Sequence, residues 1–321
     1  MARVAVVLMN LGGPDSLQAV QPFLVNLFSD PAIIDLPRFL RLPLACFVAS
    51  RRARVARDIY ARLGGRSPLL ANTEAQAQTL QAALGPGHRC FVAMRYWHPL
   101  SSETAREVAA WAPDEIVCLP LYPQFSTTTT ASSLAAWQIA AAREGLIRPT
   151  HFVRCYPCEH GLVEAIAGLV GPALDAASGT GKPPRLLFTA HGLPKRIVRG
   201  GDPYPVQVER TAAAVVAALA RPELDWRVCY QSRVGPLEWI GPATDEEIRR
   251  AGEDGVALVV APISFVSEHS ETLVELDLDY RHLAEVAGVA YYYRVATVGV
   301  EPSFIGSLAT LVKRALAGAP A

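Results

Sequence analysis

Short, almost continuously apolar runs recur along this chain, and longer helix-like stretches separate them. The runs are rich in β-branched residues and cover residues 4–8, 90–94, 116–119, 152–155, 186–189, 228–230, 256–260 and 291–295. Alternation of short strands with helices favours parallel sheets. Strands that are apolar on both faces are typical of sheets covered by helices on both sides. The sequence therefore predicts an α/β fold of parallel sheets flanked by helices.

The chain is long enough for two such units. Its 321 residues exceed the usual size of one domain. Hydrophobic residues make up 51% of the sequence and charged residues 19%, a composition that can bury two cores. Pro149 lies near the midpoint. We predict two domains on similar plans, one over residues 1–149 and one over residues 150–302, with a ligand cleft between them.

Composition and charge also bear on partners and location. Lysine plus arginine and aspartate plus glutamate number 30 each, so no overall field attracts nucleic acid, and we expect no such partner. Arg38, Arg41, Arg51 and Arg52 interrupt the most hydrophobic N-terminal stretch, so we expect no membrane-spanning segment. Residues 1–11 read as a strand rather than a secretion signal. The six cysteines lack the spacing of a disulfide scaffold, which favours a reducing cytoplasm.

The strongest chemical signal lies in residues 268–279 (EHSETLVELDLD). Wound as an α-helix, this segment places four carboxylates within an arc of roughly 80°, with apolar residues over most of the remaining surface. They belong to Glu268, Glu271, Glu275 and Asp279. Like charges four residues apart each destabilise a helix by about 0.2–0.5 kcal/mol, so folding alone does not favour such a stripe. A solvated face is one interpretation; metal handling or proton transfer is the one that we favour.

His191 is the candidate for the second half of the site. It follows the apolar run 186–190 directly and precedes a turn that contains Gly192 and Pro194. Ligands of open α/β sheets bind beyond the carboxyl ends of the strands, where this imidazole is expected. Imidazole can accept a proton near neutral pH or bind a borderline metal ion such as Fe²⁺. A structural role in the turn is the alternative, and we interpret His98 and His269 as positioning residues.

Aromatic side chains occur near the same strand ends, where they would suit a flat apolar ligand. They are Tyr60, Tyr96, Trp97, Tyr122, Phe125 and Trp239. Core packing is the alternative for each of them. The hydroxyl-rich run 126–133 precedes a helix-like stretch at 134–144, so it predicts a helix cap or backbone N–H groups that hold a carboxylate.

Taken together, these segments resemble the ferrochelatase family over nearly the whole chain, from 8–14 (LMNLGGP) to 276–280 (LDLDY). The intervening matches are 59–68 (IYARLGGRSP), 95–99 (RYWHP), 121–125 (LYPQF), 189–194 (TAHGLP), 230–236 (YQSRVGP) and 265–273 (FVSEHSETL). The number and order of these motifs make the resemblance highly specific.

The resemblance implies an enzyme that inserts Fe²⁺ into protoporphyrin IX and releases two protons to give protohaem. It implies two Rossmann-like domains with four-stranded parallel sheets, a porphyrin in the cleft between them, and a C-terminal helix at about 303–321 that returns to the first domain. His191 and Glu271 match the family's iron and proton positions, and Glu275 and Asp279 continue its acidic helix. The positions that match its porphyrin pocket are Leu11, Tyr60, Ser67, Arg95, Tyr96 and Trp239.

Two departures from the family pattern matter. Animal members hold an iron–sulfur cluster, but this chain has no cysteine after Cys229 and carries Thr127 at the upstream ligand position. We therefore expect no cluster and no permanently bound cofactor. The stretch 31–48 matches the family's apolar pocket lip, and its arginines favour peripheral contact with the inner face of a membrane over insertion. We expect a monomer without an obligate protein partner.

The mechanistic hypothesis gives His191 the first pyrrole proton and lets Glu271, Glu275 and Asp279 pass protons to solvent. A positioned base with a near-neutral pKa is worth about 10²- to 10⁴-fold in rate. The residues leave open from which side of the macrocycle iron enters. A coproporphyrin ferrochelatase, a cobalt chelatase of related fold and a non-catalytic porphyrin or metal carrier are the alternatives. A carrier would not need four carboxylates in a row.

Overall fold

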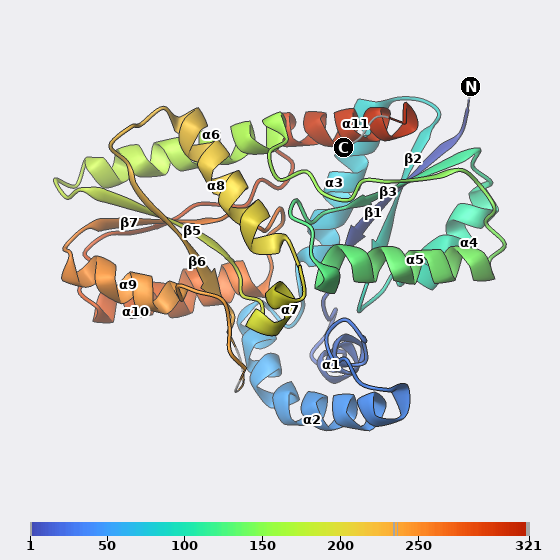
Figure 1. The fold of residues 1–321 in the computed structure, drawn as a ribbon, viewed down its shortest axis with the longest axis horizontal. Helices are drawn as coiled ribbons and strands as arrows, with labels where there is room; N and C mark the ends of the chain where they lie inside the picture. Colours follow the sequence, from blue (N-terminus) through green and yellow to red (C-terminus); the bar gives the residue numbers. More distant parts are fainter. Residues whose placement is uncertain (1, 234, 236, 319–321) are drawn as a thin grey trace. The chain divides into compact units, whose positions relative to one another are not determined.

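The computed structural model describes residues 2–233, 235 and 237–318 (Figure 1). The chain divides into two compact units. Unit 1 comprises Met1–Cys155 and Leu308–Ala321, and unit 2 comprises Tyr156–Ser307. Each unit has its own sheet and its own hydrophobic core.

Each unit is built on a four-stranded parallel sheet. The strands of unit 1 are β1 (Val4–Asn10), β2 (His88–Met94), β3 (Glu115–Pro120) and β4 (Thr150–Phe152), in the order β2-β1-β3-β4. Those of unit 2 are β5 (Pro184–His191), β6 (Asp225–Gln231), β7 (Ala257–Pro262) and β8 (Tyr292–Arg294), in the order β6-β5-β7-β8. The two orders are the same. The predicted class of two four-stranded parallel sheets flanked by helices is confirmed.

The division between the units lies beyond the predicted position at residues 149 and 150. β4 pairs with β3 through Ile116 and Thr150, so its residues belong to the first sheet and unit 1 extends to Cys155. At the other end, the division falls inside α11 (Pro302–Leu316) rather than at its start. The beginning of α11 packs closely on α6, since a Cβ added to Gly161 would lie 2.1 Å from the carbonyl oxygen of Ser303. Residues 303–307 therefore belong to unit 2.

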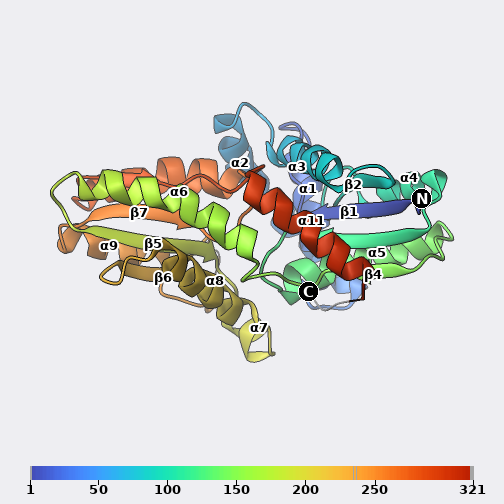
Figure 2. The ribbon, with the colours of Figure 1, turned by 90° about the horizontal axis from the view of Figure 1, so that it is seen from above.

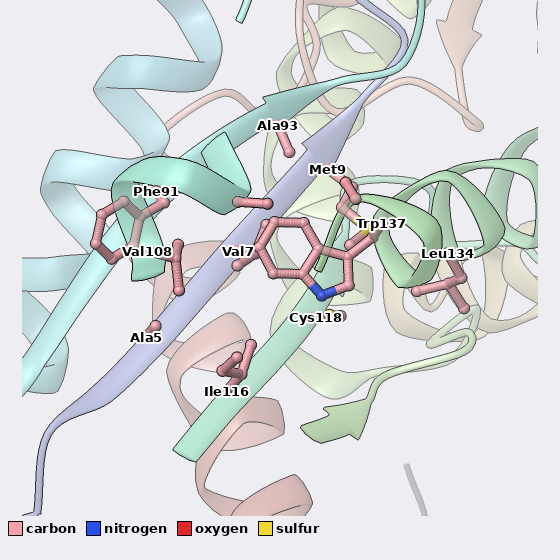
Figure 3. Packing of buried hydrophobic residues seen from close by; sticks show 12 residues of the cluster. Ala5, Val7, Met9, Phe91, Ala93, Val108, Ile116, Cys118, Leu134 and Trp137 are labelled. Carbon is pink, nitrogen blue, oxygen red and sulfur yellow. The ribbon is translucent and has the colours of Figure 1, made fainter. Parts of the chain in front are cut away.

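The helices of unit 1 are α1 (Val20–Phe28), α2 (Arg38–Arg62), α3 (Leu69–Leu84), α4 (Ser101–Trp111) and α5 (Ser132–Arg143). The first core packs one face of its sheet against α4 and α5 (Figure 3). Trp137 of α5 and Val7 of β1 lie in this cluster and are almost fully buried, at 1% and 0% exposed. All seven residues of β1 are buried, as a strand covered on both faces should be.

The helices of unit 2 are α6 (His160–Ser178), α7 (Lys195–Arg199), α8 (Tyr204–Leu219), α9 (Thr244–Glu253) and α10 (Tyr280–Val286). Within the described residues, α6 is the one helix long and apolar enough to cross a membrane, so it is an exception to the expectation that no such segment exists. It packs against α8, β5 and β7, and 44% of its most apolar window is buried (Figure 2). Its apolar residues thus serve the core of unit 2.

Among the described residues, two segments wind as π-helices, in which the hydrogen bonds run from residue i to i+5. They are η1 (Thr127–Ala131) in unit 1 and η2 (Glu271–Asp279) in unit 2. Each follows the third strand of its own unit, η1 after β3 and η2 after β7. The hydroxyl of Ser126 accepts a hydrogen bond from the backbone N–H of Thr128 at 3.2 Å, so the hydroxyl-rich run caps η1. The predicted helix at 134–144 is α5, which begins at Ser132 without a side-chain cap.

Candidate active site

The site in unit 2 starts at the ends of two neighbouring strands. His191 and Gln231 are the last residues of β5 and β6, and they face each other in the parallel register. The turn after His191 is tight, because the N–H of Gly192 donates to the carbonyl oxygen of Gln231 at 2.9 Å. A Cβ at Gly192 would lie 3.0 Å from that oxygen and 3.3 Å from Cε3 of Trp239. Glycine thus brings the Trp239 ring close to the backbone beside the histidine.

His191 and Glu271 form an ion pair across this strand edge. Nδ1 of His191 lies 2.8 Å from Oε2 of Glu271, and the two side chains are 41% and 27% exposed. No hydrogen-bond partner faces Nε2 of His191 in the part of the chain that the structure describes. Since Nδ1 is occupied by the carboxylate, Nε2 is the nitrogen that can accept a proton from a ligand.

Glu275 lies one helical turn after Glu271 and is held mainly from β6. Its Oε1 accepts from the backbone N–H of Ser232 at 2.8 Å and from the hydroxyl of Tyr280 at 3.0 Å. Its Oε2 lies 2.5 Å from Oγ of Ser232 and 3.2 Å from Nε2 of Gln231. The same Oγ lies 3.1 Å from Oε2 of Glu271. The Ser232 hydroxyl therefore bridges the two carboxylates.

The electrostatics of the His191–Glu271 pair favour a protonated histidine beside an ionised glutamate. Burial disfavours the charged form of His191, but the charge and hydrogen bond of Glu271 outweigh it and raise the pKa of His191 above its ordinary value. Burial likewise opposes ionisation of Glu271, yet His191 lowers the pKa of this carboxyl well below its usual range. Burial and the negative charge of Glu271 raise the pKa of Glu275. Two carboxylates one turn apart thus differ in how readily they take a proton.

His269 lies beside this pair. Its Nδ1 is 3.2 Å from the carbonyl oxygen of Ser267, and its Nε2 is 4.0 Å from Oε2 of Glu271. Burial lowers the pKa of His269, so the ring stays neutral more readily than His191. The side chain packs against the ring of Phe265, with ring centroids 4.6 Å apart.

The prediction of one acidic stripe on an α-helix is wrong in two respects. Residues 271–279 form a π-helix rather than an α-helix. Glu268 lies before η2 and pairs with Arg294 at 2.5 Å, while accepting the N–H of Thr297 at 2.9 Å. Glu271 and Glu275 remain together through Ser232, and Asp279 is exposed at the end of η2.

No group of three or more His, Cys, Asp or Glu side chains within residues 2–233, 235 and 237–318 is arranged to hold a metal ion. His191 and Glu271 alone offer one nitrogen and one carboxylate. An incompletely ligated metal leaves easily, as a site that transfers a metal requires. The geometry therefore suits proton acceptance and transient contact with a metal.

The remaining candidates, Leu11, Tyr60, Ser67, Arg95 and Tyr96, belong to unit 1. The carboxyl ends of β1 and β2 bring Leu11 and Tyr96 together, since the N–H of Tyr96 donates to the carbonyl oxygen of Leu11 at 2.9 Å. Leu11 and Tyr60 belong to the same hydrophobic cluster as Tyr96, which is 1% exposed. Ser67 approaches the N-terminal turn so closely that a Cβ at Gly13 would lie 2.5 Å from its Oγ.

Asp30 binds Arg95 and Tyr96, two members of this group, although the sequence did not single it out. It is 3% exposed, and its Oδ2 accepts from Nη2 of Arg95 at 2.7 Å and from the hydroxyl of Tyr96 at 2.8 Å. The hydroxyl of Ser132 donates to the same oxygen and accepts from Nε of Arg95 at 2.7 Å. Arg95 is thus fixed by a buried carboxylate.

Tyr122, His98 and Trp97 make packing or local contacts. Tyr122 is buried near Ser133, with the two hydroxyl oxygens 3.4 Å apart. His98 pairs through Nδ1 with Glu103 at 2.8 Å, next to the start of α4. Trp97 packs against the cluster of Tyr60 and Tyr96. The interpretation of His98 as a positioning residue remains a prediction.

Three residues that organise the site escaped prediction: Ser232, Asp30 and Arg294. Ser232 stands directly after a strand, where functional side chains gather, and that position is a signal in the sequence. Arg294 ends β8 and so stands at the same kind of position. Asp30 offers no such signal, and its partner Arg95 lies 65 residues away along the chain.

Comparisons with known proteins first define the fold class. The structure is similar to the sirohydrochlorin chelatase SirB from Bacillus subtilis subspecies spizizenii, solved in complex with cobalt, with a TM-score of 0.57 and 12% sequence identity. The similarity covers 98% of this chain and 95% of that one. The fold is therefore that of the metal chelatases.

Sequence comparison defines the family. The model of the ferrochelatase family matches residues 3–316. Ferrochelatase of Caulobacter vibrioides (strain NA1000 / CB15N) is 55% identical over 99% of this chain and 92% of its own length. Ferrochelatase of Phenylobacterium zucineum (strain HLK1) is 56% identical over 98% of this chain and 92% of its own length. The chain belongs to the ferrochelatase family.

Proposed function

We propose that this protein inserts Fe²⁺ into a porphyrin and releases two protons, producing haem. Family membership supports the reaction, and its substrates are a porphyrin and ferrous iron. The observation that carries the chemistry is the His191–Glu271 pair, which leaves Nε2 of the imidazole available as a base. A carrier of porphyrin or metal has no use for such a base.

The first step in this proposal is a proton transfer from a pyrrole N–H to Nε2 of His191. Glu271 stabilises the resulting imidazolium through the hydrogen bond at Nδ1. Fe²⁺ then takes the place of the pyrrole protons on the macrocycle nitrogens. Glu271 and Glu275 receive protons after His191, and Asp279 lies at the exposed end of η2. His191 and Glu271 also offer the nitrogen and oxygen ligands that suit transient contact with iron.

We further propose that the porphyrin is protoporphyrin IX and that Leu11, Tyr60, Ser67, Arg95, Tyr96 and Trp239 contact it. The N-terminal segment Asn10–Pro14, which resembles that of the protoporphyrin-using branch, supports the choice of substrate. The Trp239 ring beside the turn of Gly192 supports a flat apolar ligand near His191.

The decisive experiment mixes the purified protein anaerobically with a free-base porphyrin and Fe²⁺ or Co²⁺ and follows the visible spectrum. Catalytic turnover with Fe²⁺ and protoporphyrin IX is expected. Preference for coproporphyrin over protoporphyrin IX would make the protein a coproporphyrin ferrochelatase. Turnover with Co²⁺ but not Fe²⁺ would make it a cobalt chelatase. Stoichiometric porphyrin binding without metal insertion would make it a carrier.

We propose a cytoplasmic, monomeric enzyme without a resident cofactor or iron–sulfur cluster that touches a membrane peripherally through α2. This helix is rich in arginine and exposes large apolar side chains, with Phe39 74% and Phe47 58% exposed. Apolar residues beside basic ones suit the surface of an anionic membrane. Co-sedimentation with anionic vesicles tests this contact, and the double variant Phe39→Ser, Phe47→Ser should bind them more weakly than the wild type. With neutral vesicles, this difference between wild type and variant should disappear if charge contributes to binding.

A further inference from the structure

Ser232 holds an unusual backbone conformation. Its φ is +59°, in the left-handed region that residues other than glycine seldom adopt. Ala112 and Ala220 share this conformation, but they cap the C-terminal ends of α4 and α8, where it is common. Ser232 follows a strand instead. Backbone strain kept at such a place points to a function for the residue.

That conformation aims both polar groups of Ser232 at the acidic pair. The backbone N–H donates to Oε1 of Glu275 at 2.8 Å, while Oγ lies 2.5 Å from Oε2 of Glu275 and 3.1 Å from Oε2 of Glu271. A serine hydroxyl has one proton to donate and lone pairs with which to accept. It can bind both carboxyl groups at once when it donates a hydrogen bond to one and accepts a hydrogen bond from the other, which then carries a proton.

We propose that Ser232 is a further catalytic residue, whose hydroxyl carries a proton from Glu271 to Glu275. When Glu271 holds the proton received from Nδ1 of His191, its O–H bond breaks and a new O–H bond forms at Oγ. The original O–H bond of Ser232 breaks in the same event, and its proton joins Oε2 of Glu275. One proton moves, no electrons are transferred, and the serine is restored. This step rests on the proposed function, in which His191 is the first base.

Contacts around the bridge support a path in this direction. Oε2 of Glu271 faces Nδ1 of His191 on one side and Oγ of Ser232 on the other, so one oxygen links the imidazole to the hydroxyl. Glu275 is fixed in place by Tyr280 and Gln231 as well as by Ser232. The path therefore runs through residues from β5, η2 and β6, rather than along one face of a helix.

Ser232→Gly is the sharpest test, because it removes the hydroxymethyl side chain without straining the backbone. Glycine adopts the left-handed conformation without strain and keeps the backbone N–H that binds Glu275. We expect turnover to fall by about tenfold or more, the porphyrin KM to stay within about twofold, and the melting temperature to stay equal or rise. Ala220→Gly is the matched control, since it relieves the same conformation at the end of α8 and should leave turnover unchanged.

A second measurement separates the relay from a structural role. In stopped-flow experiments with a pH indicator, wild-type proton release should keep pace with porphyrin metallation, whereas release should lag behind metallation in Ser232→Gly. Wild-type turnover in Ser232→Gly, or a slower turnover without this lag, would overturn the relay. A wild-type protein that does not insert iron into a porphyrin would overturn the proposed function, and this inference with it.

Discussion

Nδ1 of His191 lies 2.8 Å from Oε2 of Glu271, so a histidine at the end of β5 is oriented by a carboxylate on η2, 80 residues further along the chain. In the proposed reaction, this contact leaves Nε2 of His191 to act as the base, because the carboxylate holds Nδ1. The positive charge that the ring would gain is then stabilised from its opposite side.

Replacing His191 by alanine should abolish iron insertion and leave the fold intact. The side chain is 41% exposed and ends a strand, so its loss opens no cavity in the core. Initial rates of haem formation and circular dichroism check the two parts of this prediction. Leu187→Ala is the contrasting variant, because this fully buried residue should instead lower stability by about 2–5 kcal/mol. Wild-type turnover in His191→Ala would contradict the role of the base.

The acidic residues should show graded effects on turnover. Glu271→Gln removes the partner of His191 and should slow turnover by about tenfold or more with little change in porphyrin affinity. Glu275→Gln should slow it less, and Asp279→Asn least, since that side chain is exposed. Steady-state kinetics with all three amide variants give the order. If all three variants kept the wild-type turnover rate, the acidic residues would form an ordinary solvated face without a role in catalysis.

The pH profile should report the ion pair. Glu271 raises the pKa of His191, and the imidazole must be neutral at Nε2 to accept a proton, so turnover should rise with pH through the pKa of His191. Removal of the negative charge in Glu271→Gln should move this acidic limb to lower pH. A limb that stays in place, measured as turnover across a pH series, would show that another group titrates.

Arg294 should be the main support of η2. Two of its nitrogens bind Asp277 at 2.9 and 2.5 Å and a third contact binds Glu268 at 2.5 Å, and the side chain is 11% exposed. Arg294→Met would remove the guanidinium that pairs with both carboxylates. We expect a loss of stability near the lower end of about 3–5 kcal/mol, because both carboxylates are about a quarter exposed.

Chemical denaturation measures this loss, and Arg199→Met provides the control. Arg199 pairs with Glu238 at 3.3 Å, but the two side chains are 71% and 60% exposed. Its removal should change the free energy of unfolding by less than about 1 kcal/mol. A similarly small change in the free energy of unfolding for Arg294→Met would mean that η2 does not depend on the ion pairs of Arg294.

The sequence predicted the sheets well because their strands are apolar on both faces and their polar ends stand out. His191 was predicted from its place at a strand end. Glu271 was predicted from the unfavourable clustering of like charges around it. The winding of η2 could not be predicted, because the local pattern fits an α-helix equally well. The position of Glu268 depends on Arg294, and that of Glu275 on Ser232, and both partners arrive from other strands.

The two sheets have the same strand order, and a π-helix follows the third strand of each. The backbone provides two equivalent positions. η1 fills its position with TTTTA, which carries no ionisable group, and η2 fills its own with ETLVELDLD. The two units thus share one strand order but differ in charge at this position, because η2 carries carboxylates and η1 carries no charged side chain.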